Sequence, residues 1–291
     1  MNIIEIFKRF PTEESCIAHL ETVRWKGKPI CPYCESDRTT PLKKEQRHHC
    51  NSCNTTFSVT VGTIFHHTHL PLQKWFLAVC LILNAKKGLS ARQLARDLDV
   101  HRNTAWYLAM RIRKAMEQSQ ERAILTGIVE MDECYIGGKP RKGNQGGRPA
   151  PRGRGTNKTP VVGMVERGGD VKAKVVRKKD LNNKGLSALV RSTVDLTKAT
   201  LMTDEYSGYL RMSRIVDHKT IAHAYWYVDG DIHTNTIEGF WALLKRGIVG
   251  QFHKVSVAYL PKYLDEFTYR YNHRKADDLF ALTVRRGLGV Q

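Results

Sequence analysis

The hydrophobic positions between Val228 and Ile248 follow the repeat of an amphipathic helix. Counted from Asn235, apolar residues recur at the i, i+3, i+4, i+7 and i+11 spacing of a helix face packed on a core. They are Ile237, Phe240, Trp241, Leu244 and Ile248. Asn235, Glu238 and Lys245 fall together on one flank. The pattern predicts a half-buried helix that presents a carboxylate beside a basic residue.

Glu238 has two interpretations at this point. Asn235 and Glu238 have the spacing of a capping box, in which each side chain binds a free N–H group of the first helical turn. The same carboxylate would complete a metal site if two further carboxylates came from elsewhere in the chain. The rest of the sequence has to decide between the cap and the ligand.

Short apolar runs between residues 128 and 203 predict several strands and one helix. The first run ends at Asp132 and the last ends at Asp204, so each presents an acid at a strand end. We expect one further strand before the helix at Asn235. This order of elements predicts an α/β layer architecture. The expected elements are strands at 128–131, 161–165, 171–176 and 200–203 and a helix at 184–194.

Residues 89–116 have the pattern of two helices joined by a tight turn. Ser90 and Gln93 have capping-box spacing, so a short helix should begin at Ala91. After a turn near residues 98–100, a second helix opens with polar and basic residues, which is typical of a helix-turn-helix that enters the major groove. The alternative is a helical hairpin with solvated charges. The predicted DNA contacts are His101, Arg102, Asn103, Thr104 and Arg111.

Four cysteines near the N-terminus form two pairs, Cys31 with Cys34 and Cys50 with Cys53, separated by fifteen residues. Two CxxC pairs at this separation place four thiolates around one tetrahedral Zn²⁺ ion. Four protein ligands leave no open coordination position, so the predicted zinc is structural. The other three cysteines are expected to be buried fillers. They are Cys16, Cys80 and Cys134.

The chain has 291 residues, which is enough for two or three domains. Its 47 Lys and Arg against 28 Asp and Glu give a net charge of +19 and indicate a polyanionic partner, with nucleic acid as the leading candidate. A membrane is the weaker candidate, because the longest apolar run, residues 75–83, is far short of the roughly 20 residues that span a bilayer. The short, charged N-terminus indicates a cytoplasmic protein, where cysteines bind metals rather than form disulfides.

Residues 139–158 hold seven Lys or Arg, five Gly, three Pro and no acid. This composition predicts a flexible, exposed loop. The loop either follows a phosphate backbone or serves solubility. The predicted phosphate contacts within it are Arg141, Lys142, Arg148, Arg152 and Arg154.

The three acids Asp132, Asp204 and Glu238 resemble the DDE triad of RNase H-like transposases and retroviral integrases. The phrases MDECYIGG, TDEYSGY, HTNTIEGFWALLKRG and YRYNHR resemble those of bacterial insertion-sequence transposases of the ISXO-type group. The zinc ribbon and helix-turn-helix are also similar to that group's N-terminal arrangement, so the resemblance covers nearly the whole chain. Some members of the group use Asn in place of the third acid, with a Lys downstream. Asn235 is therefore an alternative to Glu238.

The resemblance implies a multidomain fold. A small zinc ribbon with an N-terminal helix would occupy residues 1–65, an all-α helix-turn-helix domain 66–122, and an α/β RNase H-like catalytic core with a mixed sheet 123–291. The implied protein is a bacterial DNA transposase, nucleoid-associated in the cytoplasm, that binds double-stranded DNA at the ends of an insertion sequence and at a target. We expect it to act as a homo-oligomer.

The resemblance also implies the chemistry. Two Mg²⁺ or Mn²⁺ ions, held by Asp132, Asp204 and Glu238, would support strand cleavage and transfer, and Lys245 would steady a phosphate. Two other functions remain open. One is a DNA-binding regulator whose third domain only oligomerises, which explains the charge but not the three acids. The other is a nuclease that shares the metal site and lacks strand joining.

Overall fold

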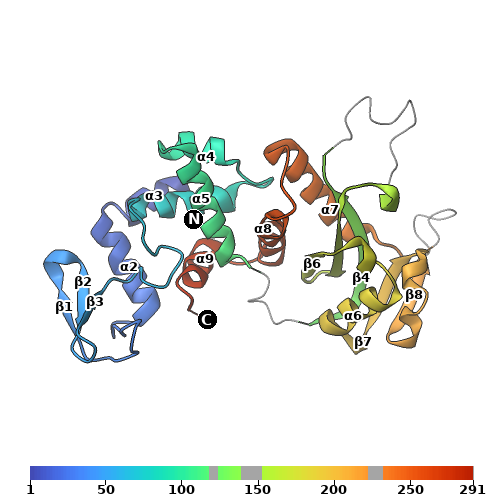
Figure 1. Ribbon diagram of the computed structural model, residues 1–291, viewed down its shortest axis with the longest axis horizontal. Helices are drawn as coiled ribbons and strands as arrows, with labels where there is room; N and C mark the ends of the chain where they lie inside the picture. Colours follow the sequence, from blue (N-terminus) through green and yellow to red (C-terminus); the bar gives the residue numbers. More distant parts are fainter. Residues whose placement is uncertain (118–123, 139–152, 222–231, 291) are drawn as a thin grey trace. The chain divides into compact units, whose positions relative to one another are not determined.

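The computed structural model describes residues 1–117, 124–138, 153–221 and 232–290. The chain divides into two compact units (Figure 1). Unit 1 combines Met1–Glu117 with Lys275–Gln291, and unit 2 is Gln118–Arg274. No helix within the described ranges has both the length and the apolar content needed to cross a bilayer.

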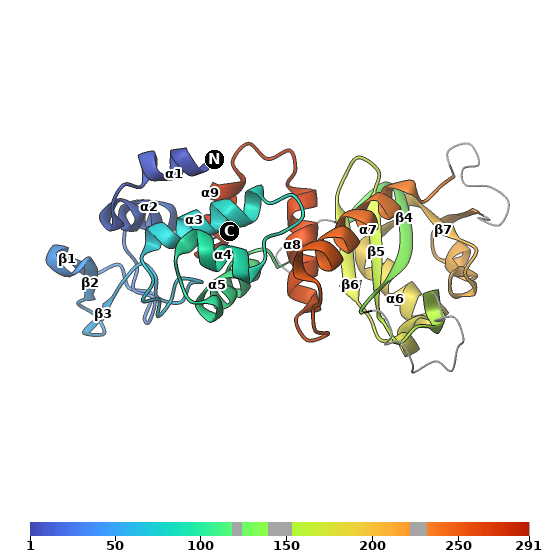
Figure 2. The same cartoon turned by 90° about the horizontal axis from the view of Figure 1, so that it is seen from above.

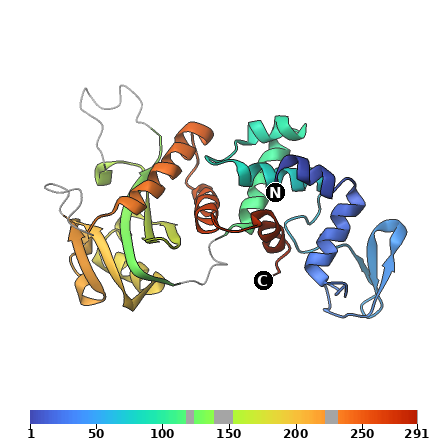
Figure 3. The same ribbon diagram turned by 180° about the vertical axis from the view of Figure 1, so that it is seen from behind.

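The first part of unit 1 contains two helices and a three-stranded antiparallel sheet, and the sheet lies beside the second helix (Figure 3). Both helices begin at capping boxes, formed by Asn2 with Glu5 and by Thr12 with Ser15, so their first turns are stabilised locally. The elements are α1 (Ile3–Arg9), α2 (Glu13–Trp25), β1 (Thr39–Leu42), β2 (Arg47–Cys50) and β3 (Thr55–Phe57).

The rest of unit 1 is helical. It contains α3 (Leu72–Asn84), α4 (Ala91–Leu98), α5 (Arg102–Ala115) and α9 (Leu279–Gly287). The short helix begins at Ala91 as predicted, because the Ser90 hydroxyl accepts the Gln93 N–H at 3.2 Å. A turn then leads into α5, which gives the two-helix unit that the sequence predicts.

The last helix lies in unit 1, which differs from the expected division of the chain. The sequence analysis assigns all of residues 123–291 to the catalytic domain, but α9 packs against α3 and α5 (Figure 1). Phe280 packs edge-on against Phe76 at 5.5 Å, and Ile64 donates its N–H to the Gly287 carbonyl at 3.0 Å. The apolar face of α9 therefore finds its partners among residues that precede the catalytic core.

Unit 2 is built on a five-stranded sheet with the order β6-β5-β4-β7-β8. Neighbours β4, β5 and β6 are antiparallel, whereas β7 and β8 run parallel to β4, which confirms the mixed sheet expected for an RNase H-like core. The strands are β4 (Leu125–Ile136), β5 (Thr159–Glu166), β6 (Val171–Val175), β7 (Val194–Asp204) and β8 (Asp217–Ile221). The last of these is the extra strand predicted before the helix at Asn235.

Helices cover both faces of this sheet (Figure 2). On one face, α6 (Asn183–Thr193) packs Leu186 and Val190 onto Val129, Met131 and Leu201 of the central strands. The opposite face carries α7 (Asn235–Gly247), which lies along β4 and β5, and α8 (Leu260–Asn272), which packs on β6. A π-helical turn at Ile248–Phe252 follows α7. Because side chains alternate along a strand, residues that neighbour the core positions on β4 point toward α7.

Strand β4, the first of unit 2, is longer than the sequence predicts. The prediction ended β4 at Met131, but the strand continues to Ile136. Beyond Glu130 it no longer pairs with β7 but still pairs with β5, from Met131 opposite Met164 to Ile136 opposite Thr159. Asp132 therefore lies within β4, at the point where the parallel pairing stops, rather than after the end of the strand.

Candidate functional site

The four predicted zinc ligands lie together in unit 1. The Cys31 and Cys53 sulfurs are 3.7 Å apart, and those of Cys34 and Cys50 are 3.5 Å apart. A tetrahedral zinc ion with bonds of about 2.3 Å would hold its sulfurs about 3.8 Å from one another. All four sulfurs also lie within 4.8 Å of one another. The geometry fits a closed structural zinc site.

Asp132 and Asp204 lie on adjacent strands of unit 2, close enough for the Asp204 charge to act on the Asp132 carboxylate. Glu130 of β4 is opposite Met202 of β7 in the last pair of the parallel register, and each aspartate follows two residues further along its strand. Residues two apart on a strand share a face. Asp204 is the last residue of β7. Both acids therefore lie at the end of the parallel pairing, on the face toward α7.

The Asp132 carboxylate is held by hydrogen bonds at both oxygens. Its Oδ1 accepts the Glu133 N–H at 2.7 Å, and its Oδ2 accepts the indole N–H of Trp241 at 3.0 Å. Burial raises the pKa of Asp132 to about 7, and the charges of Glu133 and Asp204 add to the effect. A bound cation would offset this repulsion, and carboxylate oxygens are ligands that Mg²⁺ and Mn²⁺ prefer. The donor set at this position therefore fits a divalent cation.

Trp241 reaches Asp132 because Gly163 lies beneath its ring. Gly163 is opposite Asp132 on β5, and a Cβ atom added there would come within 2.5 Å of the Trp241 ring. Real Cβ atoms do not approach other heavy atoms so closely. The glycine allows α7 to pack close to the sheet.

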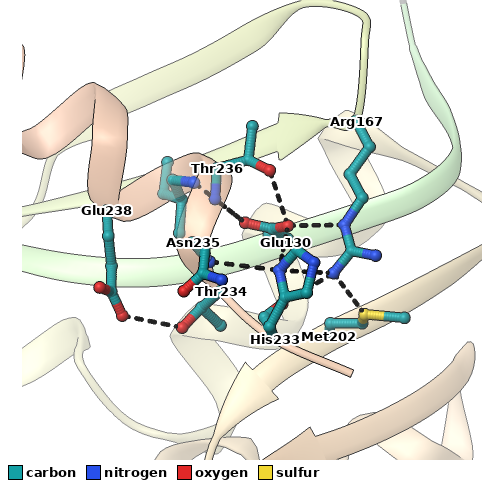
Figure 4. Close-up of polar contacts among 9 residues, drawn as sticks. Glu130, Arg167, Met202, His233, Thr234, Asn235, Thr236 and Glu238 are labelled. Atoms are coloured by element: carbon teal, nitrogen blue, oxygen red, sulfur yellow. Dashed lines mark hydrogen bonds and ion pairs between the residues drawn. The ribbon is translucent and has the colours of Figure 1, made fainter. Parts of the chain in front are cut away.

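Glu238 and Asn235 are both exposed on the first turns of α7. The helix begins at Asn235, its N-cap is Thr234, and the Thr234 side chain makes no cap hydrogen bond. The capping box between Asn235 and Glu238 is therefore wrong. Instead, the Thr234 hydroxyl donates to Glu238 Oε1 at 3.1 Å (Figure 4).

The structure does not close the predicted triad. Within the ranges that it describes, the four thiols form the one group of three or more Cys, His, Asp or Glu side chains close enough to share an ion. The Asp204 charge acts on Asp132, whereas the Glu238 carboxylate is turned toward Thr234. Glu238 would have to change its rotamer to bind the same ions as the two aspartates.

The flank of α7 that carries Glu238 is the one turned away from α8. On the other flank, Phe240 packs against Tyr271 of α8 with ring centroids 5.6 Å apart, and α8 lies over β6. At 100° per residue, Glu238 is about 160° around the helix from Phe240 and about 60° from Trp241, whereas Asn235 is about 120° from Trp241. The helical geometry therefore favours Glu238 over Asn235 as the neighbour of the aspartates.

Lys245 lies on the same stripe of α7 as Glu238, two turns further along, and is exposed. Its charge acts to lower the pKa of the Cys134 thiol, although burial of this thiol outweighs the effect and leaves its pKa raised. Cys134 is on the same face of β4 as Asp132, two residues further along. Lys245 is therefore placed beyond the aspartates along β4. Cys134, Cys16 and Cys80 are all buried, as expected.

Glu130 is a residue of this region that the sequence analysis did not identify. It is fully buried on the face of β4 that carries Asp132, and its carboxylate binds the first turn of α7 and the Arg167 guanidinium (Figure 4). The sequence feature that could have identified it is an acid two residues before Asp132, within an apolar strand.

The predicted DNA contacts of the helix-turn-helix fall into two groups. His101, Arg102, Asn103 and Thr104 are all exposed at the start of α5, where His101 Nδ1 accepts the Asn103 N–H at 3.3 Å. Arg111 is bound within the protein instead.

The Arg111 guanidinium donates to the His66 carbonyl at 2.7 Å and lies 5.5 Å from the ring centroids of Trp75 and Tyr107. These contacts give Arg111 a structural role that the expected DNA contact does not account for. The charge on this side chain is directed at carbonyl groups and aromatic rings of the same unit.

The predicted contacts of the basic loop are mostly outside the described residues. Arg141, Lys142, Arg148 and Arg152 belong to the range 139–152, which the structure does not describe. Arg154 is in the short 3-10 turn Gly153–Gly155.

Two regions of the chain match known protein families. Residues 124–272 match the ISXO2-like transposase domain, and residues 11–56 match the transposase zinc-ribbon domain. The chain belongs to the ISXO2-like transposase family. The transposase match ends before α9, which agrees with the packing of that helix in unit 1. Both zinc-ligand pairs lie inside the zinc-ribbon match.

Similar proteins include one from a mobile element. An uncharacterised protein in the transposable element ISH50 of Halobacterium salinarum is 30% identical to this transposase over 277 residues, which cover 90% of this chain and 92% of that protein. Among solved structures, a pre-cleavage Mos1 transpososome and a Mos1 transposase paired-end complex with the left transposon end are each 17% identical and cover 74% of both chains, with TM-scores of 0.31 and 0.32.

Proposed function

We propose that this DNA transposase cuts and joins DNA strands at a site formed by Asp132, Asp204 and Glu238. The observation that carries the proposal is that Asp132 and Asp204 follow the last parallel pair of β4 and β7, with the Asp132 carboxylate buried and acted on by the Asp204 charge. Two close carboxylates in a partly buried position favour the binding of a divalent cation.

When bound, two Mg²⁺ or Mn²⁺ ions would supply activation of the attacking oxygen and stabilisation of the leaving oxygen in an in-line displacement at phosphorus. Asp132 and Asp204 hold their carboxylates at fixed positions on a rigid sheet, and Trp241 orients the Asp132 side chain. Lys245 would orient a phosphate group near the cut. The reaction needs no covalent link between the protein and DNA.

Glu238 is the third ligand in this proposal. To bind the ions, its side chain would have to leave Thr234 and turn toward the aspartates. Asn235 lies farther around the helix from Trp241, and we propose that it contacts substrate rather than the ions. Glu238→Gln should therefore reduce cleavage more than Asn235→Ala.

The exposed residues at the start of α5 are the proposed DNA-reading surface. His101, Arg102, Asn103 and Thr104 follow one another on the first turn of the second helix of the pair, which is the part that contacts base edges in helix-turn-helix proteins. The basic residues of 139–158 would add phosphate contacts. We propose that two or more copies pair the ends of the element.

A strand-joining assay tests the function. The zinc-loaded protein is incubated with a labelled end of its element and a target plasmid, with Mg²⁺ or with no added Mg²⁺ or Mn²⁺. The proposal predicts cleavage at the end and a joined product with Mg²⁺ and neither without it. Cleavage without any joined product would identify a nuclease, and binding without cleavage would identify a regulator. Either result contradicts the proposal.

A further inference from the structure

Glu130 has no solvent exposure, and both oxygens of its carboxylate accept hydrogen bonds. Its Oε2 accepts the Thr236 N–H at 2.7 Å and the Ile237 N–H at 3.0 Å, and its Oε1 accepts the Thr236 hydroxyl at 2.8 Å. Arg167 Nε donates to Oε1 at 2.6 Å. A buried charge is retained only with such partners, so the carboxylate is committed to this cluster.

Two of these donors are the free N–H groups at the start of α7. A helix normally satisfies them with its own N-cap side chain, but the Thr234 hydroxyl donates to Glu238 instead. Glu130 therefore caps α7 from another element, and its negative charge is stabilised by the positive end of the helix dipole. The start of α7 is fastened to β4 two residues before Asp132.

Arg167 and His233 complete the cluster from two further segments (Figure 4). Arg167 follows β5, and its Nη2 donates to the His233 carbonyl at 3.0 Å and lies 2.9 Å from His233 Nδ1. The same nitrogen contacts the Met202 sulfur of β7 at 3.2 Å. The cluster therefore joins β4, β5, β7 and the residue that precedes Thr234.

Glu238 lies between the two points at which α7 is fastened to β4. On its N-terminal side, Thr236 and Ile237 bind Glu130, and on its C-terminal side, Trp241 binds Asp132. Both bonds go to the same face of one strand. Both bonds set the distance of α7 from the sheet and its rotation about its own axis. These two parameters determine how closely the Glu238 side chain can approach the aspartates.

We propose that Glu130 is a positioning residue that, through the first turn of α7, sets the reach of Glu238 toward ions held by Asp132 and Asp204. This inference rests on the proposed function. Glu130 does not itself contact the ions or the DNA, because its oxygens are occupied by α7 and Arg167 and it is closed to solvent. Its effect is on metal affinity, transmitted through Glu238.

Metal affinity in a double-mutant cycle tests the proposal. Mn²⁺ binding is measured by calorimetry, without DNA, on the zinc-loaded protein, Glu130→Gln, Glu238→Gln and the double variant. Replacing groups that orient metal ligands typically weakens metal binding by about 10- to 100-fold. We expect a loss of about tenfold for Glu130→Gln, and the double variant should bind like Glu238→Gln alone, because both changes remove the same contribution. If the losses of Mn²⁺ affinity in the two single variants multiply in the double variant, the proposal is overturned.

Two controls separate a positioning role from a general loss of stability. Val190→Ala removes buried volume from α6, on the opposite face of the sheet, and should lower the Tm while Mn²⁺ affinity stays unchanged. Thr236→Val removes only the hydroxyl donor at 2.8 Å and should weaken Mn²⁺ binding by a smaller factor, so it serves as the variant if Glu130→Gln does not fold. Wild-type affinity in both Glu130→Gln and Thr236→Val would refute the inference.

Asp132→Asn separates failure of this inference from failure of the proposed function. If Asp132→Asn binds Mn²⁺ as well as the wild type, the metal site itself is wrong. If Asp132→Asn loses Mn²⁺ and Glu130→Gln keeps it, the site stands and the positioning role of Glu130 is refuted.

Discussion

The indole N–H of Trp241 donates to Asp132 Oδ2 at 3.0 Å and so joins α7 directly to the central strand of the sheet. The bond links the helix that carries Glu238 to the acid at the centre of the proposed site. It also uses one lone pair of Asp132 and leaves others on the carboxylate for a cation. The chemistry of the site should therefore respond to changes in Trp241 that leave the fold intact.

Trp241→Phe keeps an aromatic ring in place and removes the hydrogen bond to Asp132. We expect cleavage of a labelled end to slow by about tenfold, as for the loss of other groups that orient metal ligands. Phe240→Leu is the matched control, because it changes the α8 side of α7 without touching Asp132. A Phe240→Leu variant that loses as much activity as Trp241→Phe would assign the effect to packing.

Gly163→Ala introduces a Cβ atom within 2.5 Å of the Trp241 ring. We expect the free energy of unfolding to fall by about 1–3 kcal/mol, which is typical of overpacking, and cleavage to fall with it. Gly239→Ala, on the same helix, meets no atom within 4 Å. Chemical denaturation should show it unchanged or more stable by up to about 1 kcal/mol, because Ala favours a helix over Gly. Equal effects of the two substitutions would contradict the packing described.

Removal of zinc should unfold the ribbon. We expect the protein to contain one zinc per chain by elemental analysis, and Cys31→Ser or a strong chelator to release it and remove a cooperative unfolding transition, because structural zinc supplies folding energy. Cys16→Ala is the control: Cys16 is buried but outside the thiol cluster, and this variant should retain its zinc. A wild-type protein without zinc would refute the ribbon site.

Arg102 and Arg111 should respond differently to substitution although both are on α5. Arg102→Ala should weaken binding to the element's end by about 1–3 kcal/mol if it reads a base, with the Tm unchanged, because the residue is exposed. Arg111→Ala should lower the Tm, because it removes bonds to the His66 carbonyl and contacts with two rings. Thermal melts and fluorescence anisotropy measure the two effects, and the reverse pattern would contradict the structure.

Local patterns in the sequence were sufficient to predict much of the fold. The CxxC spacing predicts the thiol cluster, Ser90 predicts the start of α4, and apolar runs predict the strands of the mixed sheet. Each of these signals depends on residues close together in the chain. The end of β4 was missed because its second half pairs only with β5, and a strand's partners are not visible in its own sequence.

Features that depend on distant residues could not be predicted in this way. Asn235 and Glu238 have capping-box spacing, but the cap of α7 comes from Glu130, more than 100 residues earlier in the chain. Arg111 has the place of a DNA contact in the sequence, yet its partners are a carbonyl and rings from preceding segments. The packing of α9 in unit 1 likewise depends on Phe76 and Ile64, which its own pattern does not indicate.

The central claim, that Asp132 and Asp204 hold the catalytic ions, is tested most directly by single-turnover cleavage of a pre-bound labelled end. Asp132→Asn and Asp204→Asn should bind the end within about twofold of the wild type. Because a bound metal ion supplies several kcal/mol of transition-state stabilisation, a variant that no longer holds it should cleave the end at least about a thousandfold more slowly. Undiminished cleavage by either variant would contradict the account.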